Sequence, residues 1–588
     1  MSAGTWLIGI VVVPAVATVL SYLFTSVVRR VATVVSGLAT LALSVMVAVR
    51  VAGGGRVVAG TLFGADSLSG IFLLVTAFLY AATAIFSIGY LGGSRGMGEL
   101  IGRVGQVVRQ GASAGKDGDS EEASQQWAVS DRFDKRFFTG INIFCGAMSA
   151  ALILSNLSLV WVAIEITTVV SALLVSLEDT DGASEAAWKY VIIASMGLGL
   201  SLLGVFVLYV AAAPVLGSSH ALQIGYLAHV HGLARGTVEL AFVLAVIGFG
   251  TKMGLAPMHT WLPDAHSEAP TPVSALLSGS LLAVSFYAIL RFEQVTVLNV
   301  GNVFPHDVLL AFGVLSLLIA ALFLLVQRDM KRMFAYSSVE HMGIIAIGAG
   351  FGVPIALAGV MLHVVSHGLA KGTAFFGAGS FKIKFGTKDI SRISGGLTAL
   401  PWSGSLLLAA VAALSALPPF ALFRSEFMIV DGGLSAGQDL GVVVLLVLVT
   451  VAFAGLSWNT VKIILSPDRP NGPSMLAPGS PAISGSSGPS GGLGTGGGLD
   501  AGASQGGGHD SPGTAVSASV DGTIPPGSSD NSVIMPLEVA GSQGLCAWMV
   551  VPMLAGVVGL VLLGLHPPAD FMRLVDSAAR ELTGRVAR

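Results

Sequence analysis

The chain consists largely of apolar segments whose length matches the thickness of a lipid bilayer. A membrane-spanning helix needs about 20 consecutive, mostly apolar residues. Strict alternation of apolar and polar residues, the mark of a membrane β-barrel, is absent from these segments. The sequence therefore predicts an all-α polytopic membrane protein with fourteen spans, at residues 5–24, 31–50, 68–91, 137–155, 157–176, 186–211, 238–257, 273–292, 307–327, 333–350, 354–379, 403–420, 440–466 and 545–565.

Charge is too scarce for a soluble protein of this length. Only 11% of the 588 residues are charged, against about 25% in a soluble domain, which excludes a soluble enzyme with a polar surface. The net charge of −3 argues against a nucleic-acid partner. Cys145 and Cys546 lie far apart, and Cys-ligated metal clusters generally need three or four thiolates. We therefore expect no cofactor or metal in this chain.

The chain divides into five regions. The boundaries are 1–91 for a three-span segment, 92–136 for a polar cytoplasmic loop, 137–466 for the core, 467–543 for a linker, and 544–588 for the last span with its tail. The linker is rich in Gly, Ser and Pro, which is typical of disordered segments. The tail has apolar residues at helical spacing, which favours an amphipathic helix at the membrane interface.

The distribution of basic residues predicts the orientation of the spans. Cytoplasmic loops carry an excess of Lys and Arg, and the odd-numbered loops hold 18 basic residues against five in the even-numbered loops. These counts include Lys331 and Arg291 as loop residues. Both termini are therefore expected outside the cytoplasm, in a multi-pass protein of the cell (inner) membrane. Arg50, Arg291 and Lys462, at the ends of spans, are counted with the adjoining loops, whereas Lys189, Lys252 and Lys371 are assigned to predicted helices and to no loop.

Two ionisable residues interrupt apolar spans in the first half of the core. Glu165 lies near the middle of span 5, and Lys252 lies in span 7. A charge at the bilayer centre costs at least ~2.5–3.5 kcal/mol on insertion scales, so such residues are functional candidates by default. A carboxylate and an ammonium on adjacent spans can pair, and opening the pair changes both proton affinities. We expect a role in transport; the alternative is a static ion pair that fixes helix packing.

The second half of the core carries a denser group of titratable residues. Glu340 and His341 lie in span 10, whereas His363, His367 and Lys371 follow one stripe of span 11 at i, i+4 and i+8. Histidine is suited to proton transfer near neutral pH, so the stripe predicts a proton path. His363 and His367 also have the spacing of metal ligands, but a third ligand is not evident, and we expect no metal.

Two spans are interrupted by helix-breaking residues. Span 7 contains several glycines and ends at Pro257, just after Lys252, and span 12 is broken at Pro418 and Pro419, a few residues before Glu426. Broken helices at corresponding positions of two halves indicate the ion site of a transporter built from inverted repeats. The spacing of five spans favours such a repeat over two unrelated kinks.

Three long motifs resemble a known family. GTKMGLAPMHTWLPDAHSEAPTPVSALLSG (250–279), KRMFAYSSVEHMGIIAIGAGFG (331–352) and VVSHGLAKGTAFFGAGS (364–380) resemble antiporter-like membrane subunits. That family occurs in respiratory complex I, in Mrp-type sodium/proton antiporters and in group 4 NiFe hydrogenases. SEAPTPVSALLSG with SVEHMG is most similar to hydrogenase-4 or formate-hydrogenlyase membrane subunits. The resemblance implies fourteen core helices, with spans 4–8 and 9–13 as inverted five-helix repeats.

The resemblance also implies roles for individual residues. Glu165 and Lys252 match the pair of the first half-channel, His341 and His367 match the connecting histidines, and Glu426 matches the span 12 residue that ends the relay. Complex I members commonly carry a lysine in the middle of span 8, where this chain has Ala283. This departure favours the hydrogenase branch. The bridge between the half-channels must then use water, His341 or nearby polar groups, or be broken.

These observations predict a non-redox, proton-translocating membrane subunit of a multi-subunit oxidoreductase. Protons would enter from the cytoplasm near Lys252, pass His341, Lys371 and His367, and leave near Glu426. NiFe and iron–sulfur clusters, or a flavin, are expected on partner subunits of a peripheral redox arm. The rivals are an Mrp-type cation/proton antiporter subunit and a membrane anchor that has lost transport. Further residues expected to support the path are Lys189, His259, His266, Glu340 and His363.

Overall fold

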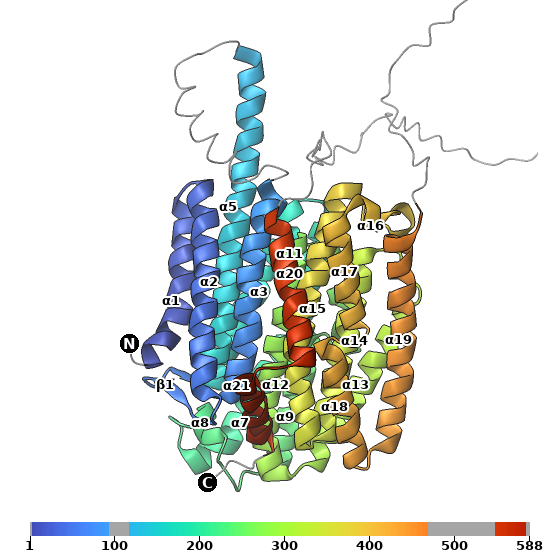
Figure 1. Cartoon of the computed structure of the whole chain (residues 1–588). Helices are drawn as coiled ribbons and strands as arrows, with labels where there is room; N and C mark the ends of the chain where they lie inside the picture. The colour runs from blue at the N-terminus through green and yellow to red at the C-terminus, as the bar shows by residue number, and fades with distance from the viewer. Residues whose placement is uncertain (1–2, 93–116, 468–546, 584–588) are drawn as a thin grey trace, which may run out of the picture. The chain divides into compact units, whose positions relative to one another are not determined.

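The computed structural model describes residues 3–92, 117–467 and 547–583. Residues 93–116 of the predicted polar loop and 468–543 of the predicted linker lie outside these ranges. The described chain is a bundle of helices (Figure 1). Their bounds are α1 Ala3–Leu23, α2 Ser26–Val51, α3 Ser67–Gly92, α5 Asp117–Ile153, α6 Leu157–Val175, α7 Asp181–Leu216, α8 Ile224–Leu227, α9 Arg235–Met253, α10 Trp261–Glu268, α11 Thr271–Leu276, α12 Leu282–Val300, α13 Val303–Leu324, α14 Met330–Phe351, α15 Pro354–Phe385, α16 Gly396–Ala399, α17 Pro401–Leu414, α18 Ala421–Ser435, α19 Asp439–Leu465, α20 Ala547–Leu565 and α21 Ala569–Leu582.

Each predicted span coincides with a helix or with a broken helix. Within the described residues, twelve helical segments are long and apolar enough to cross a membrane. The remaining two of the fourteen are α14, which carries several charged residues, and α17, which is an apolar helix of only 14 residues. An all-α membrane protein is therefore confirmed, whereas the count of fourteen and the inverted repeats remain predictions.

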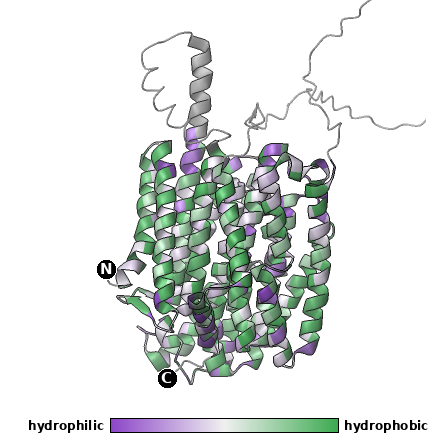
Figure 2. Cartoon of the chain, in the orientation of Figure 1, coloured by the Kyte–Doolittle hydropathy of each residue, from purple (hydrophilic) through white to green (hydrophobic). Residues whose placement is uncertain are grey.

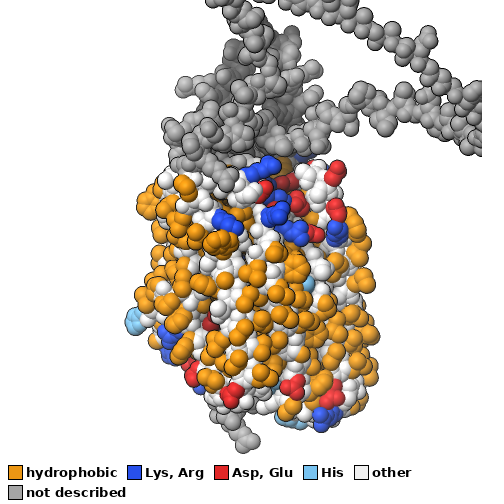
Figure 3. Space-filling view, turned by 90° about the vertical axis from the view of Figure 1, so that its right-hand side faces the viewer, with side chains coloured by type: hydrophobic (Ala, Val, Ile, Leu, Met, Phe, Trp, Pro, Cys, Tyr) orange, Lys and Arg blue, Asp and Glu red, His pale blue; other side chains and the backbone are white. Residues whose placement is uncertain are grey.

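The helices form an apolar outer wall around a centre that contains polar residues. Figure 2 shows hydrophobic residues along the middle of the helices, and Figure 3 shows an apolar flank with charged side chains gathered near its ends. α12 and α15 lie at the centre and bury most of their side chains, including polar ones. Buried polar groups in lipid-embedded proteins face protein or water rather than lipid. The centre of the bundle is therefore where a functional site is expected.

Close helix packing at the centre depends on small residues. α13 and α14 approach each other at Gly313 and Gly343, where a Cβ added to Gly343 would lie 2.9 Å from the carbonyl oxygen of Gly313. Small residues allow helix backbones to approach in membranes, where dispersion contacts rather than the hydrophobic effect hold helices together. This contact fixes α14, the helix that carries Glu340 and His341.

The two predicted helix breaks are present. α9 ends at Met253, with Gly254 in a left-handed conformation (φ +86°), and the chain resumes as α10 at Trp261. A glycine there ends a helix without the steric cost of a Cβ. In the second half, α17 ends at Leu414 and α18 begins at Ala421. A third irregularity, a π-helical segment at Leu277–Leu281 between α11 and α12, was not predicted.

The ends of the described chain lie at the same end of the bundle (Figure 1). There, between α2 and α3, strands β1 (Val57–Ala59) and β2 (Phe63–Ala65) pair antiparallel with Val57 opposite Ala65. The predicted tail helix is present as α21, which buries an apolar face that includes Leu574, Val575 and Leu582. Both termini on one side agrees with an even number of spans, and the cytoplasmic or external identity of that side remains a prediction.

Candidate functional site

Lys252 is completely buried in the last turn of α9, beside the first helix break. Its ammonium donates to the hydroxyl of Thr168 and, at 3.4 Å, to the carbonyl oxygen of Ile164, both on α6. The ring of Tyr190 on α7 lies with its centre 5.7 Å from the Lys252 nitrogen. A cation is favoured in the last turn of α9, because a helix C-terminus is electronegative. The protein thus holds a buried ammonium with hydroxyl, carbonyl and aromatic neighbours.

Glu165 lies one turn before Thr168 on α6 and is half-buried. One of its carboxylate oxygens accepts from the Ser195 hydroxyl at 3.4 Å, and the other is buried without a partner among the described residues. The ion pairs of the described chain do not include Glu165 with Lys252, so the expected direct pair is not formed. The two charges interact electrostatically over a longer distance. The Lys252 ammonium therefore contacts the Thr168 hydroxyl, where the sequence predicted the Glu165 carboxylate.

A short connector joins the first break to the second half of the bundle. In α10, Trp261 packs between Tyr190, at 4.5 Å between ring centres, and His266, at 6.4 Å. The His266 ring stacks on Phe375 of α15 at 5.5 Å, and both of its nitrogens lack partners within the described residues. His259, just before α10, is buried against the ring of Tyr336 on α14. Both predicted supporting histidines therefore lie between the two halves.

Lys331 is a buried cation of the connector that the sequence analysis missed. It was counted as a loop residue, but it is fully buried in the first turn of α14. Its ammonium donates to the carbonyl oxygens of Ser267, at 2.9 Å, and Ala269, where α10 ends. An ammonium stabilises the free carbonyls of a helix C-terminus. Lys331 is buried because the end of α10 lies beside it in the folded protein. A count of basic residues in loops cannot reveal this.

A hydroxyl pair joins the π-helical segment to α14. Ser278 and Ser338 lie 2.7 Å apart, oxygen to oxygen, and both are buried. The Ser338 hydroxyl also donates to the carbonyl oxygen of Phe334 at 2.9 Å, and Lys371 of α15 donates to the same oxygen at 2.9 Å. π-Helical segments often occur at functional sites. This serine contact lies a few residues before Ala283 and joins the π-helical segment to α14.

Three histidines form a buried cluster between α14 and α15. Nδ1 of His341 lies 3.1 Å from Nε2 of His363, and the ring centres of His341 and His367 lie 5.3 Å apart. Nε2 of His341 and both nitrogens of His367 lack hydrogen-bond partners among the described residues. Such buried polar atoms need water or a bound ion. His363 and His367 therefore lie along one helix, α15, as predicted, and His341 from the adjacent α14 lies beside them.

The hydrogen bonds of the cluster assign the protonation of His363. The Ser425 hydroxyl of α18 donates to the carbonyl oxygen of Leu422 at 2.8 Å, so its oxygen accepts the contact of 3.0 Å with Nδ1 of His363. His363 then carries its proton on Nδ1, and Nε2 accepts from Nδ1 of His341. Nε2 of His341 makes no well-aligned hydrogen bond within the described residues, although the main-chain carbonyl of Leu414 interacts with this ring. A proton that arrives there releases the Nδ1 proton toward His363, which gives the pair a direction.

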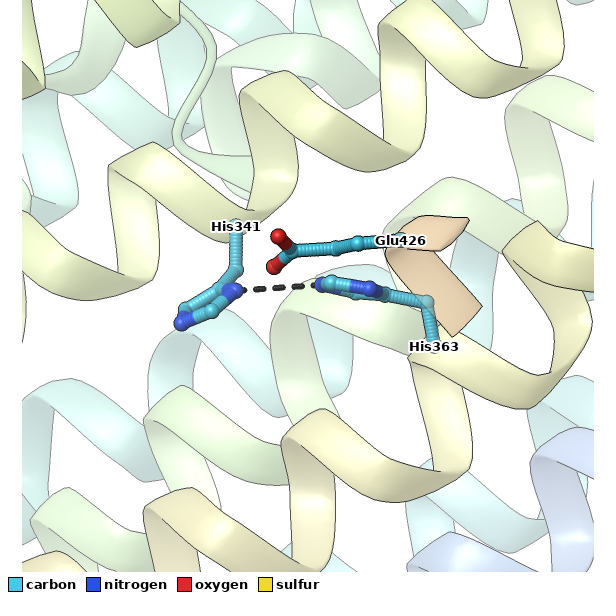
Figure 4. Close-up of side chains that lie close together, drawn as sticks. All are labelled: His341, His363 and Glu426. Carbon is cyan, nitrogen blue, oxygen red and sulfur yellow. Dashed lines mark hydrogen bonds between the residues drawn. The ribbon is translucent and has the colours of Figure 1, made fainter. Parts of the chain in front are cut away.

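Glu426 joins the histidine pair from a third helix. One ligand atom each from His341, His363 and Glu426 lie within 4.8 Å of one another, and Figure 4 shows the carboxylate extending toward the two rings. Glu426 is half-buried on α18, one residue after Ser425. Glu340 is buried on α14, with one oxygen unpartnered within the described chain, and interacts electrostatically with Lys371. The predicted end of the relay is thus adjacent to the histidines.

Lys189 lies within a helix, α7, as predicted, whereas Arg291 was wrongly counted with a loop. Lys189 is not enclosed: its side chain is 38% exposed and pairs with Glu185 at 2.5 Å on the surface of α7. Arg291 was counted in a loop, but it is buried in α12 and pairs with Asp66 at 2.6 Å. Hydropathy windows locate spans to within several residues, so the depth of a charge near a span end is poorly defined. Only Lys252 and Lys371 of the three helix lysines are buried.

The described chain is thus a helical membrane protein whose buried ionisable side chains lie along its centre, and known proteins share this architecture. The family model described as "NADH:quinone oxidoreductase/Mrp antiporter, TM" matches residues 155–453. The hydrogenase-4 component F homolog of Methylacidiphilum infernorum is 35% identical over 412 residues, which cover 70% of this chain and 80% of that protein. The chain therefore belongs to the NADH:quinone oxidoreductase/Mrp antiporter transmembrane family.

Solved structures share the fold at lower sequence identity. A chain of the Mrp complex from Dietzia sp. DQ12-45-1b superposes with a TM-score of 0.72 at 17% identity, over 99% of this chain and 97% of that one. A chain of respiratory complex I from Thermus thermophilus with bound NADH gives 0.68 at 18% identity, over 98% and 99%. The family predicted from the three motifs is confirmed, including the relationship to hydrogenase-4. The protein is an antiporter-like membrane subunit of this type.

Proposed function

We propose that the chain carries protons across the membrane as the non-redox subunit of a larger oxidoreductase. A proton enters from the cytoplasm at the Lys252 site and passes the connector of His259, His266 and Lys331. It then reaches Lys371 and the histidine cluster and leaves at Glu426. Water molecules complete the steps where side chains lie beyond hydrogen-bond distance. Electrostatic change at Glu165 and Lys252, driven by electron transfer elsewhere, supplies the driving force.

The observation that carries this proposal is the directed contact between His341 and His363, 3.1 Å apart and ending at Ser425 and Glu426. Buried imidazoles that donate to one another are suited to proton transfer. A structural role alone would require the ring nitrogens to be satisfied, yet Nε2 of His341 and both nitrogens of His367 are not. The cluster has the donors, acceptors and direction that a relay needs.

The partners and their cofactors follow from the family. A hydrogenase-4 component F homolog is a relative, and a chain of respiratory complex I shares the fold. We therefore propose that this chain assembles with other membrane subunits and a peripheral redox arm in the cell membrane. NiFe and iron–sulfur clusters, or a flavin, would lie on that arm. The residues described here offer a proton path and no thiolate set for a cluster.

The Lys252→Ala substitution tests the proposal. The substitution removes the buried ammonium beside the first helix break, so proton uptake into inverted membrane vesicles should fall to background. Electron transfer by the partner arm should continue in part, because no redox group is touched. Lys462→Ala, which changes an exposed lysine on α19, is the control. Proton uptake at the wild-type rate in the Lys252→Ala vesicles would refute this mechanism.

A second function, cation/proton antiport without a redox arm, is favoured by the superposition with the Mrp complex chain, at a TM-score of 0.72. Co-purification distinguishes the two, because a hydrogenase or dehydrogenase arm should accompany an oxidoreductase subunit. Rescue of a sodium-sensitive strain without such an arm would favour the antiporter. A third reading, an anchor without transport, predicts that reconstituted vesicles show neither proton movement nor proton leak.

A further inference from the structure

The histidine cluster has the donor set of a transition-metal site. His341, His363 and Glu426 each offer one ligand atom, and these atoms lie within 4.8 Å of one another. Two imidazole nitrogens and a carboxylate oxygen are the ligands found in many zinc sites, with a fourth position left to water or substrate. The sequence argument against a metal was the lack of a third ligand. Glu426 supplies it, from a helix that is 63 residues away from His363 in the chain.

The distances in the cluster are close to those that a tetrahedral ion requires. Ligand atoms about 2.0–2.1 Å from a zinc ion lie about 3.3–3.4 Å from one another. Nδ1 of His341 and Nε2 of His363 are already 3.1 Å apart, so an ion can replace the bridging proton with little movement of the rings. The proton of His341 then moves to Nε2, which is buried and unpartnered within the described residues.

The surroundings of the cluster also resemble those of metal ligands. A metal-bound histidine usually donates its second ring N–H to an oxygen that fixes the orientation of the ring. Nδ1 of His363 does this to Ser425, at 3.0 Å, and leaves Nε2 free to ligate. His367, whose ring centre lies 5.3 Å from that of His341 and whose nitrogens lack partners in the described chain, stands beside the fourth position.

We propose that His341, His363 and Glu426 bind a divalent transition-metal ion of the Zn²⁺ or Co²⁺ type, and that bound metal blocks the proton path. The ion enters past Glu426, which is half-buried, and then holds both imidazole nitrogens that would otherwise exchange protons. The blocking effect rests on the proposed function, whereas the binding itself does not. The site is inhibitory: the ion competes with protons for the same lone pairs.

The binding test uses the purified full-length chain with any subunits that accompany it, treated with a chelator and then titrated with Co²⁺. We expect one Co²⁺ per chain with the intense visible absorption of a tetrahedral site, displaced by Zn²⁺. His363→Gln and Glu426→Gln should each weaken binding at least tenfold. His220→Gln, at an exposed loop position, is the matched control and should bind as the wild type does.

A milder variant covers the case in which a ligand substitution prevents folding. Ser425→Ala keeps all three ligands and removes only the oxygen that orients His363, so Co²⁺ affinity should fall about 10- to 100-fold, as for other residues that orient ligands. A wild-type chain that binds no Co²⁺, or variants that all bind as tightly as the wild type, would overturn the metal site.

Vesicle measurements separate this inference from the proposed function. Zn²⁺ should inhibit proton uptake over the concentration range in which it displaces Co²⁺. Proton uptake by a chain that binds no metal would support the proposed function and refute the metal site. Metal binding by a chain that moves no protons would support the metal site and refute the proposed function. Proton uptake that continues with the site filled would overturn the blocking effect alone.

Discussion

The two halves of the core hold their buried charges in different ways. In the first half, a single ammonium, that of Lys252, is bound by the hydroxyl of Thr168 and a main-chain carbonyl. In the second half, imidazoles contact one another and end at the carboxylate of Glu426. The first arrangement stabilises one charge in one place. The second can pass a proton between equivalent groups, so the halves are suited to sensing a field and to relaying a proton, respectively.

The strongest test of this contrast is His341→Gln. Glutamine keeps the polarity of the site but cannot take up and release a proton, so proton uptake should fall about 100-fold or more, the range for loss of a proton-transfer group. The measurement is the initial rate of proton uptake in vesicles, with His220→Gln as control. A reduction of less than about threefold would mean that the second half does not relay protons through this ring.

Thr168→Val tests how the first half holds its charge. Valine has nearly the same shape but cannot accept from the Lys252 ammonium, and a hydrogen bond to a charged group contributes about 1.5–3 kcal/mol. Proton uptake should therefore fall about tenfold, with a shifted pH dependence of the rate. Thr460→Val is the matched control, because the buried Thr460 hydroxyl donates only within its own helix, to the Leu456 carbonyl at 2.8 Å. Equal effects of the two substitutions would contradict the assignment.

Ser338→Ala tests the contact between the halves. The change removes the hydroxyl pair with Ser278 and leaves α14 intact, so we expect proton uptake to fall about three- to fivefold, consistent with about 1 kcal/mol for one neutral hydrogen bond. Ser366→Ala is the control, since the Ser366 hydroxyl donates only within its own helix, to Leu362 at 2.7 Å. If both variants transport alike, the bridge between the halves lies elsewhere.

The smallest effect is expected at α21, which packs against helices of both halves. Glu581 accepts from the main-chain N–H groups of Ser67 and Leu68 at the start of α3. Burial, followed by the nearby Asp66 charge, raises the pKa of Glu581 to about 7, although Arg291 and these N–H groups oppose the rise. The docked state therefore binds the proton more tightly, and docking is strongest below the ordinary pKa and weakens as pH rises through 7.

Hydrogen exchange of α21, corrected for the intrinsic pH effect, measures this docking. Exchange in the wild type should increase several-fold between pH 5 and pH 8, and Glu581→Gln should reduce that dependence because its side chain stays neutral. Asp66 shows the opposite behaviour: burial favours its neutral form, but Arg291 prevails and holds the pKa at about 2. An unchanged pH dependence in Glu581→Gln would mean that another group controls the docking of α21.

Much of the fold could be predicted because lipid imposes simple requirements. Apolar length located the helices, and the residues around Pro257 and Pro418 located the breaks. Charge in an apolar span singled out Glu165, Lys252 and Lys371. These inferences succeed because each depends on residues that are neighbours in the chain.

The details of the site could not be predicted in the same way, because they depend on residues distant in the chain. The direct Glu165–Lys252 pair was expected from adjacent spans, but side-chain direction gives the contact to Thr168. Lys331 was assigned to a loop, although its partners Ser267 and Ala269 lie 62 to 64 residues away. The approach of Glu426 to His341 and His363, within 4.8 Å between ligand atoms, likewise depends on three helices. No spacing in the sequence predicts it.

Lys331 is a physical link through which the two halves could be coupled. Its ammonium ties the end of α10, beyond the first break, to the first turn of α14, which carries His341. Any free energy that protonation at Lys252 stores in this link must equal the free energy by which protonation of the histidines alters Lys252, because coupling between sites is reciprocal. Coupling through Lys331 would therefore let the protonation state of one half alter the proton affinity of the other.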